Sequence, residues 1–189
     1  MSPITHLLIS WVVADAGDLN KRERAIVTVA GLAPDVDGFG IIAEALTRES
    51  EHPLTWWTDY HHVLGHNLGF GLLVAAVSFA LATRRWKAAA LAFLTFHLHL
   101  VCDLVGARGP EGYQWPIPYL LPFSNEWQWV WEGQWALNAW PNFVITGVVL
   151  LLTFYWAWKK GHSPVEMISA AADKAFVETL RRRIPINDN

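Results

Sequence analysis

The chain has 189 residues, of which 53% are hydrophobic and only 16% are charged, whereas soluble domains carry roughly 25% charged residues. The formal net charge is −3 and no basic patch lies among the aromatic residues, so nothing indicates nucleic-acid binding. Cys102 is the only cysteine, which excludes intramolecular disulfides and metal sites of the CxxC type. The twelve tryptophans favour a membrane protein, because tryptophan prefers the membrane–water interface.

Five apolar stretches predict membrane-embedded helices. They cover residues 4–14, 25–33, 67–83, 87–105 and 141–158. A spanning helix needs about 20 apolar residues, so the first two stretches would have to be tilted, extended into polar flanks or buried in the bundle. The predicted fold class is all-α: a polytopic membrane helix bundle of about five membrane-embedded helices plus a C-terminal amphipathic helix. A soluble helical bundle is the alternative, and the almost uncharged stretch 141–158 counts against it.

Basic residues between the stretches predict an orientation. They form three clusters: Lys21, Arg22 and Arg24; Arg84, Arg85 and Lys87; and Lys159 with Lys160. If the helices alternate in direction, all three clusters fall on one side of the membrane. The positive-inside rule makes that side cytoplasmic.

The C-terminal region differs in character from the rest of the chain. Ser163 and Pro164 are typical of a helix start, and apolar residues then recur at helical spacing as far as Leu180, before three arginines. This pattern predicts an amphipathic helix on the cytoplasmic membrane surface, with partner binding as the alternative. We therefore divide the chain into a membrane-embedded domain, 1–160, and a cytoplasmic helix and tail, 161–189.

Histidine and aspartate residues gather at the predicted external ends of the helices. The set is His6, Asp35, Asp37, His61, His62, His66, His99 and Asp103. Both residue types bind zinc-like ions, and a carboxylate in an apolar bundle is costly unless it is paired or ligated. The basic loops are distinct from these residues, so the convergence of the histidines and aspartates on one side predicts a functional site, either a metal site or a proton relay.

Spacing shows which of these residues can share one ion. His99 and Asp103 are four residues apart on a predicted helix, and therefore lie on one face of it. Asp35 and Asp37 can both face the site only because Pro34 and Gly38 favour a turn rather than a regular helix.

The segment from His61 to His66 leaves two pairings open. In a helical segment, His62 and His66 share a face; in a loop that enters a helix, His61 and His66 can converge. The Gly-, Pro- and Trp-rich residues 106–140 are predicted to lie along the external interface as a lid over the site.

Several motifs resemble, in order, those of the bacterial membrane-bound, metal-dependent hydrolase family. They are Thr5-His6, Pro34-Asp35-Val36-Asp37, the His61…His66 block, and His99-xxx-Asp103 ahead of a Pro-rich segment. The order of His, Asp, His and HxxxD is also similar to that of zinc-dependent phospholipase C. The family pattern HRGxTHS differs here, since His62 takes the place of the arginine.

The resemblance implies a set of metal ligands: His6, Asp35, His61, His66, His99 and Asp103. It implies hydrolysis of a phosphoester, with Asp37 as a ligand or general base. No phosphate-binding glycine loop, GxSxG serine or cysteine nucleophile is evident, so a metal-activated water is the expected nucleophile.

These features predict a hydrolase of the bacterial inner membrane whose site faces the periplasm. One or two divalent ions, expected to be Zn²⁺, would act on a membrane lipid or lipid-linked substrate, with Asp37 and His62 as catalytic residues. One alternative is a metal or proton transporter, which needs sites near the membrane midplane. Another is a non-enzymatic membrane protein whose structural metal has a closed coordination shell.

Overall fold

The computed structural model describes residues 1–109 and 114–185. Within these residues every regular element is helical and no strand forms, although the segment after residue 106 makes two isolated β-bridges. The predicted all-α class is confirmed. Residues 110–113 of the predicted lid and residues 186–189 of the predicted tail lie outside the described part.

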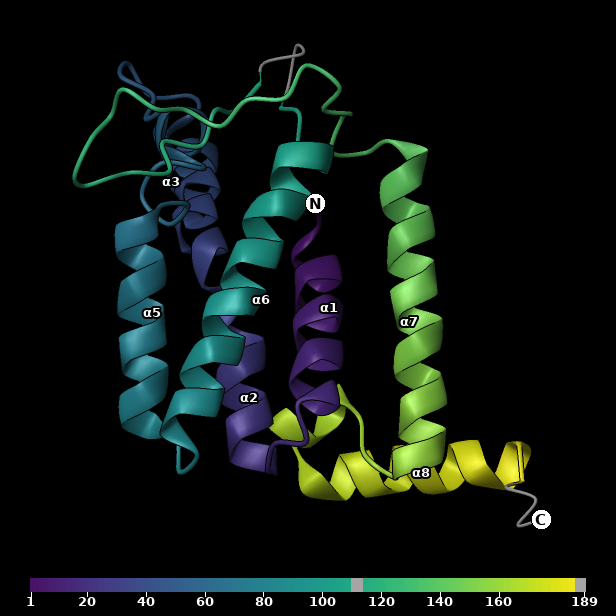
Figure 1. Cartoon of the computed structure of the whole chain (residues 1–189). Helices are drawn as coiled ribbons and strands as arrows, with labels where there is room; N and C mark the ends of the chain where they lie inside the picture. Colours follow the sequence, from purple (N-terminus) through teal and green to yellow (C-terminus); the bar gives the residue numbers. More distant parts are fainter. Residues whose placement is uncertain (110–113, 186–189) are drawn as a thin grey trace.

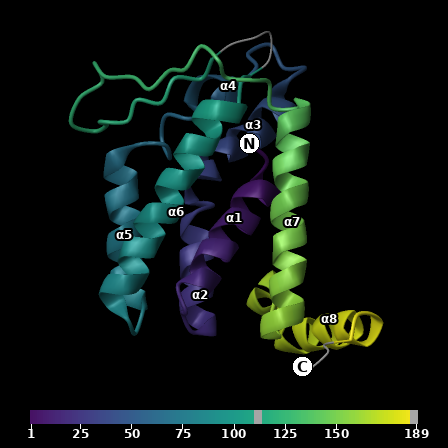
Figure 2. The same cartoon turned by 45° about the vertical axis from the view of Figure 1, so that its right-hand side comes forward.

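Five helices run side by side in the bundle (Figures 1 and 2). They are α1 (Pro3–Ala16), α2 (Lys21–Ala30), α5 (Leu68–Leu81), α6 (Arg85–Gly106) and α7 (Trp140–Lys160). Helix α6 packs against α1, α2 and α5, while α7 packs against α1. Each helix corresponds to one predicted apolar stretch. The agreement arises because each run is long enough to bury an apolar face on its neighbours.

Polar caps fix where several of these helices begin. The side chain of Ser2 accepts a hydrogen bond from the backbone N–H of Thr5, and Asn67 accepts one from Phe70. Asn20 and Glu23 form a reciprocal capping box at the start of α2. Such caps satisfy N–H groups that have no partner within the helix.

Only part of the predicted membrane crossing is supported by helix length. Helices α6 and α7 are long and apolar enough to cross a membrane, and α2 becomes a third candidate if it is joined to the segment Ala33–Thr47 across a 51° bend. Helices α1 and α5 have 14 residues each, about 21 Å, which is shorter than a hydrocarbon core of about 30 Å. Two or three candidate spans do not confirm the predicted count of five membrane-embedded helices.

Close helix packing depends on small residues at the centre of the bundle. Ala14, Ala30, Ala88 and Ala92 are buried together between α1, α2 and α6. At the end of α2, a Cβ on Gly31 would lie only 1.9 Å from the Oγ of Ser10. Glycine therefore lets α2 approach α1 closely, just before the chain turns toward the predicted site.

Short elements cover the site end of the bundle. They are the 3-10 helix η1 (Ala33–Phe39), α3 (Gly40–Thr47) and α4 (Trp56–Tyr60), followed later in the chain by the connection between α6 and α7. Figures 1 and 2 show these elements together above the ends of α5 and α6. Because η1 is not a regular α-helix, Asp35 and Asp37 can both turn inward, as the proline and glycine of this segment predicted.

The opposite end of the bundle carries helix α8 (Ala170–Arg183), which lies across the helix ends (Figure 1). The sequence predicted one helix from Ser163, but the structure forms a short 3-10 helix, η3 (Pro164–Met167), before α8 begins. Two caps explain the interruption. Ser163 caps η3 and is tied to Asp173, whereas Ser169 caps α8.

The three basic clusters lie at this same end. Helices α2 and α6 begin there and α7 ends there, so the basic residues that flank them share the end occupied by α8 (Figure 1). The amino-terminal end of α1 and the carboxyl-terminal end of α6 lie at the other end, with the predicted site residues. The separation of basic clusters from the site, expected from helix alternation, is present in the fold.

Candidate metal centre

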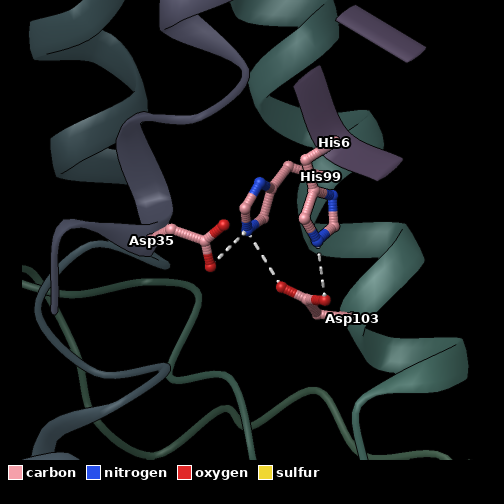
Figure 3. Close-up of side chains that lie close together, drawn as sticks. All are labelled: His6, Asp35, His99 and Asp103. Atoms are coloured by element: carbon pink, nitrogen blue, oxygen red, sulfur yellow. Dashed lines mark hydrogen bonds and ion pairs between the residues drawn. The ribbon is translucent and has the colours of Figure 1, made fainter. Parts of the chain in front are cut away.

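Four predicted ligands from three elements converge at the site end of the bundle (Figure 3). His6 comes from α1, Asp35 from η1, and His99 and Asp103 from α6. One ligand atom of each lies within 4.8 Å of the others. His99 Nε2 is 2.9 Å from Asp103 Oδ2 and 3.6 Å from Asp35 Oδ1, while His6 Nε2 is 3.1 Å from Asp103 Oδ1.

A second cluster uses the same aspartate. His62, His66 and Asp103 also place ligand atoms within 4.8 Å of one another, and all three side chains are buried. Asp103 Oδ2 lies 3.3 Å from His66 Nε2 and 3.6 Å from His62 Nε2. Asp103 therefore stands between two groups of potential ligands, in the position of a carboxylate that can bridge two cations.

Hydrogen bonds on the far side of each ring orient the histidines. The Nδ1 of His99 donates to the carbonyl oxygen of Gly31 over 2.7 Å, and that of His66 donates to Asp37 Oδ2 over 3.1 Å. His62 Nδ1 lies 3.4 Å from the carbonyl oxygen of Trp115. In each case Nε2 faces Asp103. Metal-binding histidines are oriented in this way, because a proton held on one nitrogen leaves the other free as a ligand.

Buried polar atoms that lack hydrogen-bond partners indicate whether the site fits a cation. His62 Nε2, His99 Nε2 and Asp35 Oδ2 are buried and have no hydrogen-bond partner among the described residues. His99 Nε2 lies close to Asp103 but without the geometry of a hydrogen bond. Buried polar atoms without partners are costly, and a divalent cation would satisfy the two imidazole nitrogens. Imidazole nitrogen and carboxylate oxygen are ligands that Zn²⁺ accepts, so the residues present fit a metal.

A positive charge already lies against the shared aspartate. The amino group of Met1 contacts Asp103 Oδ1, next to His6. Burial alone lowers the pKa of His66, but hydrogen bonds to Asp103 and Asp37 outweigh burial and raise that pKa to about 9. The carboxylate thus attracts cationic groups from both sides, as expected for a buried charge.

The two nearby histidines differ in protonation. Burial holds the pKa of His62 well below its usual value, so the His62 ring is neutral at physiological pH. A neutral ring is the form that binds a metal. His62 is therefore suited to be a ligand as it stands, whereas a metal would displace a proton from His66.

Asp37 lies behind the second cluster and not in it. Its Oδ1 accepts from His61 Nδ1 over 2.9 Å, and its Oδ2 accepts from His66 Nδ1 and from the backbone N–H of Gly65. Both oxygens are thereby occupied. The Asp37 carboxylate orients His66, which is the usual role of a carboxylate behind a metal-binding histidine.

The structure groups three residues differently from the sequence assignment. The sequence predicted His61 as a ligand and Asp37 with His62 as catalytic residues. The structure instead places His62 beside Asp103, and His61 belongs to neither cluster. The backbone of His62 has φ 69°, a left-handed conformation that costs about 1–3 kcal/mol for a residue other than glycine. That turn, and not a helix, brings His62 and His66 to the same side.

A tight contact fixes this turn. A Cβ on Gly65 would lie 2.2 Å from the carbonyl oxygen of Pro34, so only glycine lets the histidine segment pack on η1. The same approach brings the N–H of Gly65 to Asp37. The two halves of the site, one around Pro34 and one around Gly65, are therefore joined by direct backbone packing.

Comparison with known proteins gives a family. Residues 1–175 match the model of the YdjM inner membrane protein family. The chain belongs to this family. The match covers both clusters and places this YdjM-family protein in the bacterial inner membrane, as the sequence predicted. No curated protein and no solved structure matches the chain, so the resemblance to zinc-dependent phospholipase C has no counterpart in these comparisons.

The connection between α6 and α7 covers the site of this YdjM-family protein. The ring of Trp115 packs edge-on against His61, with centroids 4.8 Å apart, and lies 5.4 Å from the ring of His62. Gln134 Nε2 donates to the carbonyl oxygen of Asp103 over 2.8 Å. Sequence reasoning singled out neither residue, although both fall in the predicted lid.

A cavity of about 740 Å³ opens beside the clusters. Asp35, His61 and Asp103 line its polar part, and most of its remaining wall is apolar, including Leu32, Phe39, Ile42 and Trp115. None of the described residues that line it is lysine or arginine. The cavity is therefore bordered by the carboxylates of Asp35 and Asp103, the ring of His61 and Met1, and otherwise by apolar residues, which suits an apolar molecule with a polar end.

Proposed function

We propose that this YdjM-family protein is a metal-dependent hydrolase that cleaves a phosphoester in a membrane lipid or lipid-linked molecule. One observation carries the proposal: two clusters of histidine and aspartate share the buried Asp103, and Asp103 and Asp35 line a large, mostly apolar cavity. A lipid combines a long apolar part with a polar linkage, which matches the two kinds of wall in that cavity.

The donor set favours Zn²⁺ at one or both clusters. His6, His99, Asp35 and Asp103 offer four nitrogen and oxygen ligands, and His62 and His66 offer two more beside the same aspartate. When bound, a divalent ion would polarise a phosphoryl oxygen and lower the pKa of a water molecule toward 7. The resemblance to metal-dependent hydrolases in the order of these residues supports the same chemistry.

The residues of the chain supply positioning and a proton acceptor. Asp35 is the member of the first cluster that lines the cavity and has an unpartnered oxygen. We assign to Asp35 the acceptance of a proton from the attacking water. Asp37 holds His66, and the carbonyl oxygen of Gly31 holds His99, so neither ring has to reorient during the reaction.

The site is proposed to face the periplasm. The basic clusters surround the end of the bundle that carries α8, and the positive-inside rule makes that end cytoplasmic. The clusters lie at the opposite end, under the Trp-rich connection. A substrate would enter the cavity laterally from the outer leaflet of the inner membrane.

The same observations support hydrolysis over its rivals. A transporter needs a site that can be reached from both sides, whereas both clusters lie at one end of the bundle. A structural metal would have a closed shell of ligands, whereas a cavity of about 740 Å³ borders these clusters. Both comparisons support an active site with an open position.

Metal analysis paired with a lipid-hydrolysis screen tests the proposal. Purified wild-type protein should contain a divalent metal and hydrolyse at least one class of phospholipid, while His99→Ala should lose both properties. His52→Ala, in an exposed loop, is the matched control and should keep both. Folded wild-type protein that never binds a metal, or full activity in His99→Ala, would rule out this mechanism.

A further inference from the structure

A second apolar space lies between α2 and α5. It is a groove of about 470 Å³ whose wall is apolar apart from Ser78. Alanines 25, 30 and 33 line it from one side, and Val77 and Leu81 are among the residues that line it from α5. Small side chains on the α2 side leave this space open, because alanine fills little of the gap between neighbouring helices.

The groove adjoins the cavity beside the metal-ligand clusters. Val29 and Ala33 line both spaces, and Ala33 lies two residues before Asp35. The residues shared by the two spaces are apolar, so an apolar chain that leaves the cavity would meet only apolar side chains and Ser78 along the groove. We infer that the groove holds a hydrocarbon chain of the lipid on which the clusters act, an inference that rests on the proposed hydrolase function.

The direction of the groove agrees with the position of a lipid in the leaflet nearest the site. Between Phe70 and Leu81 it follows α5 for about 16 Å, starting near the site end and running toward the α8 end. A chain in it would point from the clusters toward the middle of the bilayer. Lipids of the leaflet at the site end have that orientation, with the polar group outward and the chain inward.

The groove would act through orientation and not through hydrophobic affinity. The bilayer is already apolar, so moving a chain from the bilayer into the groove removes almost no apolar surface from water. Packing along α2 and α5 instead fixes where the linkage at the head of the chain lies. Correct placement of a reacting bond lowers the barrier without new chemical groups. Specificity for chain length should follow.

Photo-crosslinking in vesicles tests the groove independently of hydrolysis. Full-length protein is reconstituted with a phospholipid that carries a diazirine at the end of one acyl chain, and the labelled peptides are mapped by mass spectrometry. Label is expected on α2 and α5. The Val77→Trp and Val29→Trp variants fill the groove from either side and should lower that label several-fold.

Val148→Trp on α7 is the matched control, since Val148 is 60% exposed and outside both spaces, while Val77 is 47% exposed. It should leave the label on α2 and α5 unchanged. Label spread equally over α7 in the wild type, or label unaffected by both groove variants, would overturn the inference.

Hydrolysis of matched long- and short-chain substrates separates this inference from the proposed function. Val77→Trp should lower kcat/KM for the long-chain substrate and leave the short-chain substrate and the metal content unchanged. If Val77→Trp changed kcat/KM by the same factor for both substrates, the result would contradict the groove and leave the proposed hydrolase function standing. Groove label without hydrolysis of any lipid would contradict the hydrolase and leave a lipid-binding groove.

Discussion

The two ends of the helix bundle both bury acidic side chains, but they satisfy them differently. At the α8 end, Asp15 accepts hydrogen bonds from Lys160 and His162, each over 2.6 Å, and Glu166 accepts two from Arg24 over 2.7 and 2.8 Å. At the site end, Asp103 is contacted by histidine rings and by the amino group of Met1, and Asp35 Oδ2 has no described partner.

We interpret the charges of the α8 end as structural and propose a functional role for those of the site end. Paired charges with complete hydrogen bonds hold elements together, and here they tie η3 and the end of α7 to α1 and α2. Incompletely satisfied groups that border a cavity are typical of sites that bind a ligand. The α8 end is accordingly expected to affect stability, and the site end to affect metal content and activity.

The largest expected effect comes from Asp103, which both clusters share. Asp103→Asn keeps the shape of the side chain but removes the charge that would bind a cation. We expect loss of bound metal and hydrolytic activity below detection, measured by elemental analysis and the lipid assay. Asp173→Asn, at the α8 end, is the control and should retain both. Metal binding that survives in Asp103→Asn would remove the central ligand from the proposed site.

The next effect is on stability at the other end. Arg24→Ala leaves the buried carboxylate of Glu166 without its partner, and breaking such a pair costs about 3 kcal/mol or more. The free energy of unfolding in detergent should fall accordingly, while metal bound per folded molecule stays constant. Adding Glu166→Gln should recover part of the loss. A large drop in metal content without loss of stability would break the distinction between the ends.

A smaller effect is expected at Asp37, which orients His66 without joining either cluster. Replacing such a carboxylate lowers metal affinity or activity by about 10–100-fold, and Asp37→Asn should fall in this range. The exposed Asp59→Asn is the control. Metal titration followed by activity measures the shift. A loss as complete as that in Asp103→Asn would show that Asp37 binds the metal directly.

The smallest effect is expected at the capping box of α2. Asn20→Ala removes one acceptor for the backbone N–H of Glu23 and should reduce stability by about 1 kcal/mol. Thermal unfolding measures the change, and metal content should not alter. An effect on the metal would mean that the start of α2 is coupled to the site at its far end.

Much of the fold was predictable because it depends on local pattern. Apolar runs long enough to cover a helix face located all five bundle helices, and the alternation of those helices separated the basic clusters from the site. The number of membrane spans was not predictable in the same way. Helices α1 and α5 are short, so whether they cross depends on tilt and neighbours, and not on their own composition.

The candidate site also has a part that local sequence pattern predicts and a part that depends on tertiary packing. The sequence by itself determined the pair His99 and Asp103, because residues four apart on a helix must share a face. Only the tertiary structure shows that His62, and not His61, lies beside Asp103 and His66. The left-handed backbone of His62 and the packing of Gly65 on Pro34 set the direction of those rings, and both depend on a contact some thirty residues away along the chain. Residue types and helical spacing are local properties, whereas the direction of a side chain in a turn is set by the segments that pack against it.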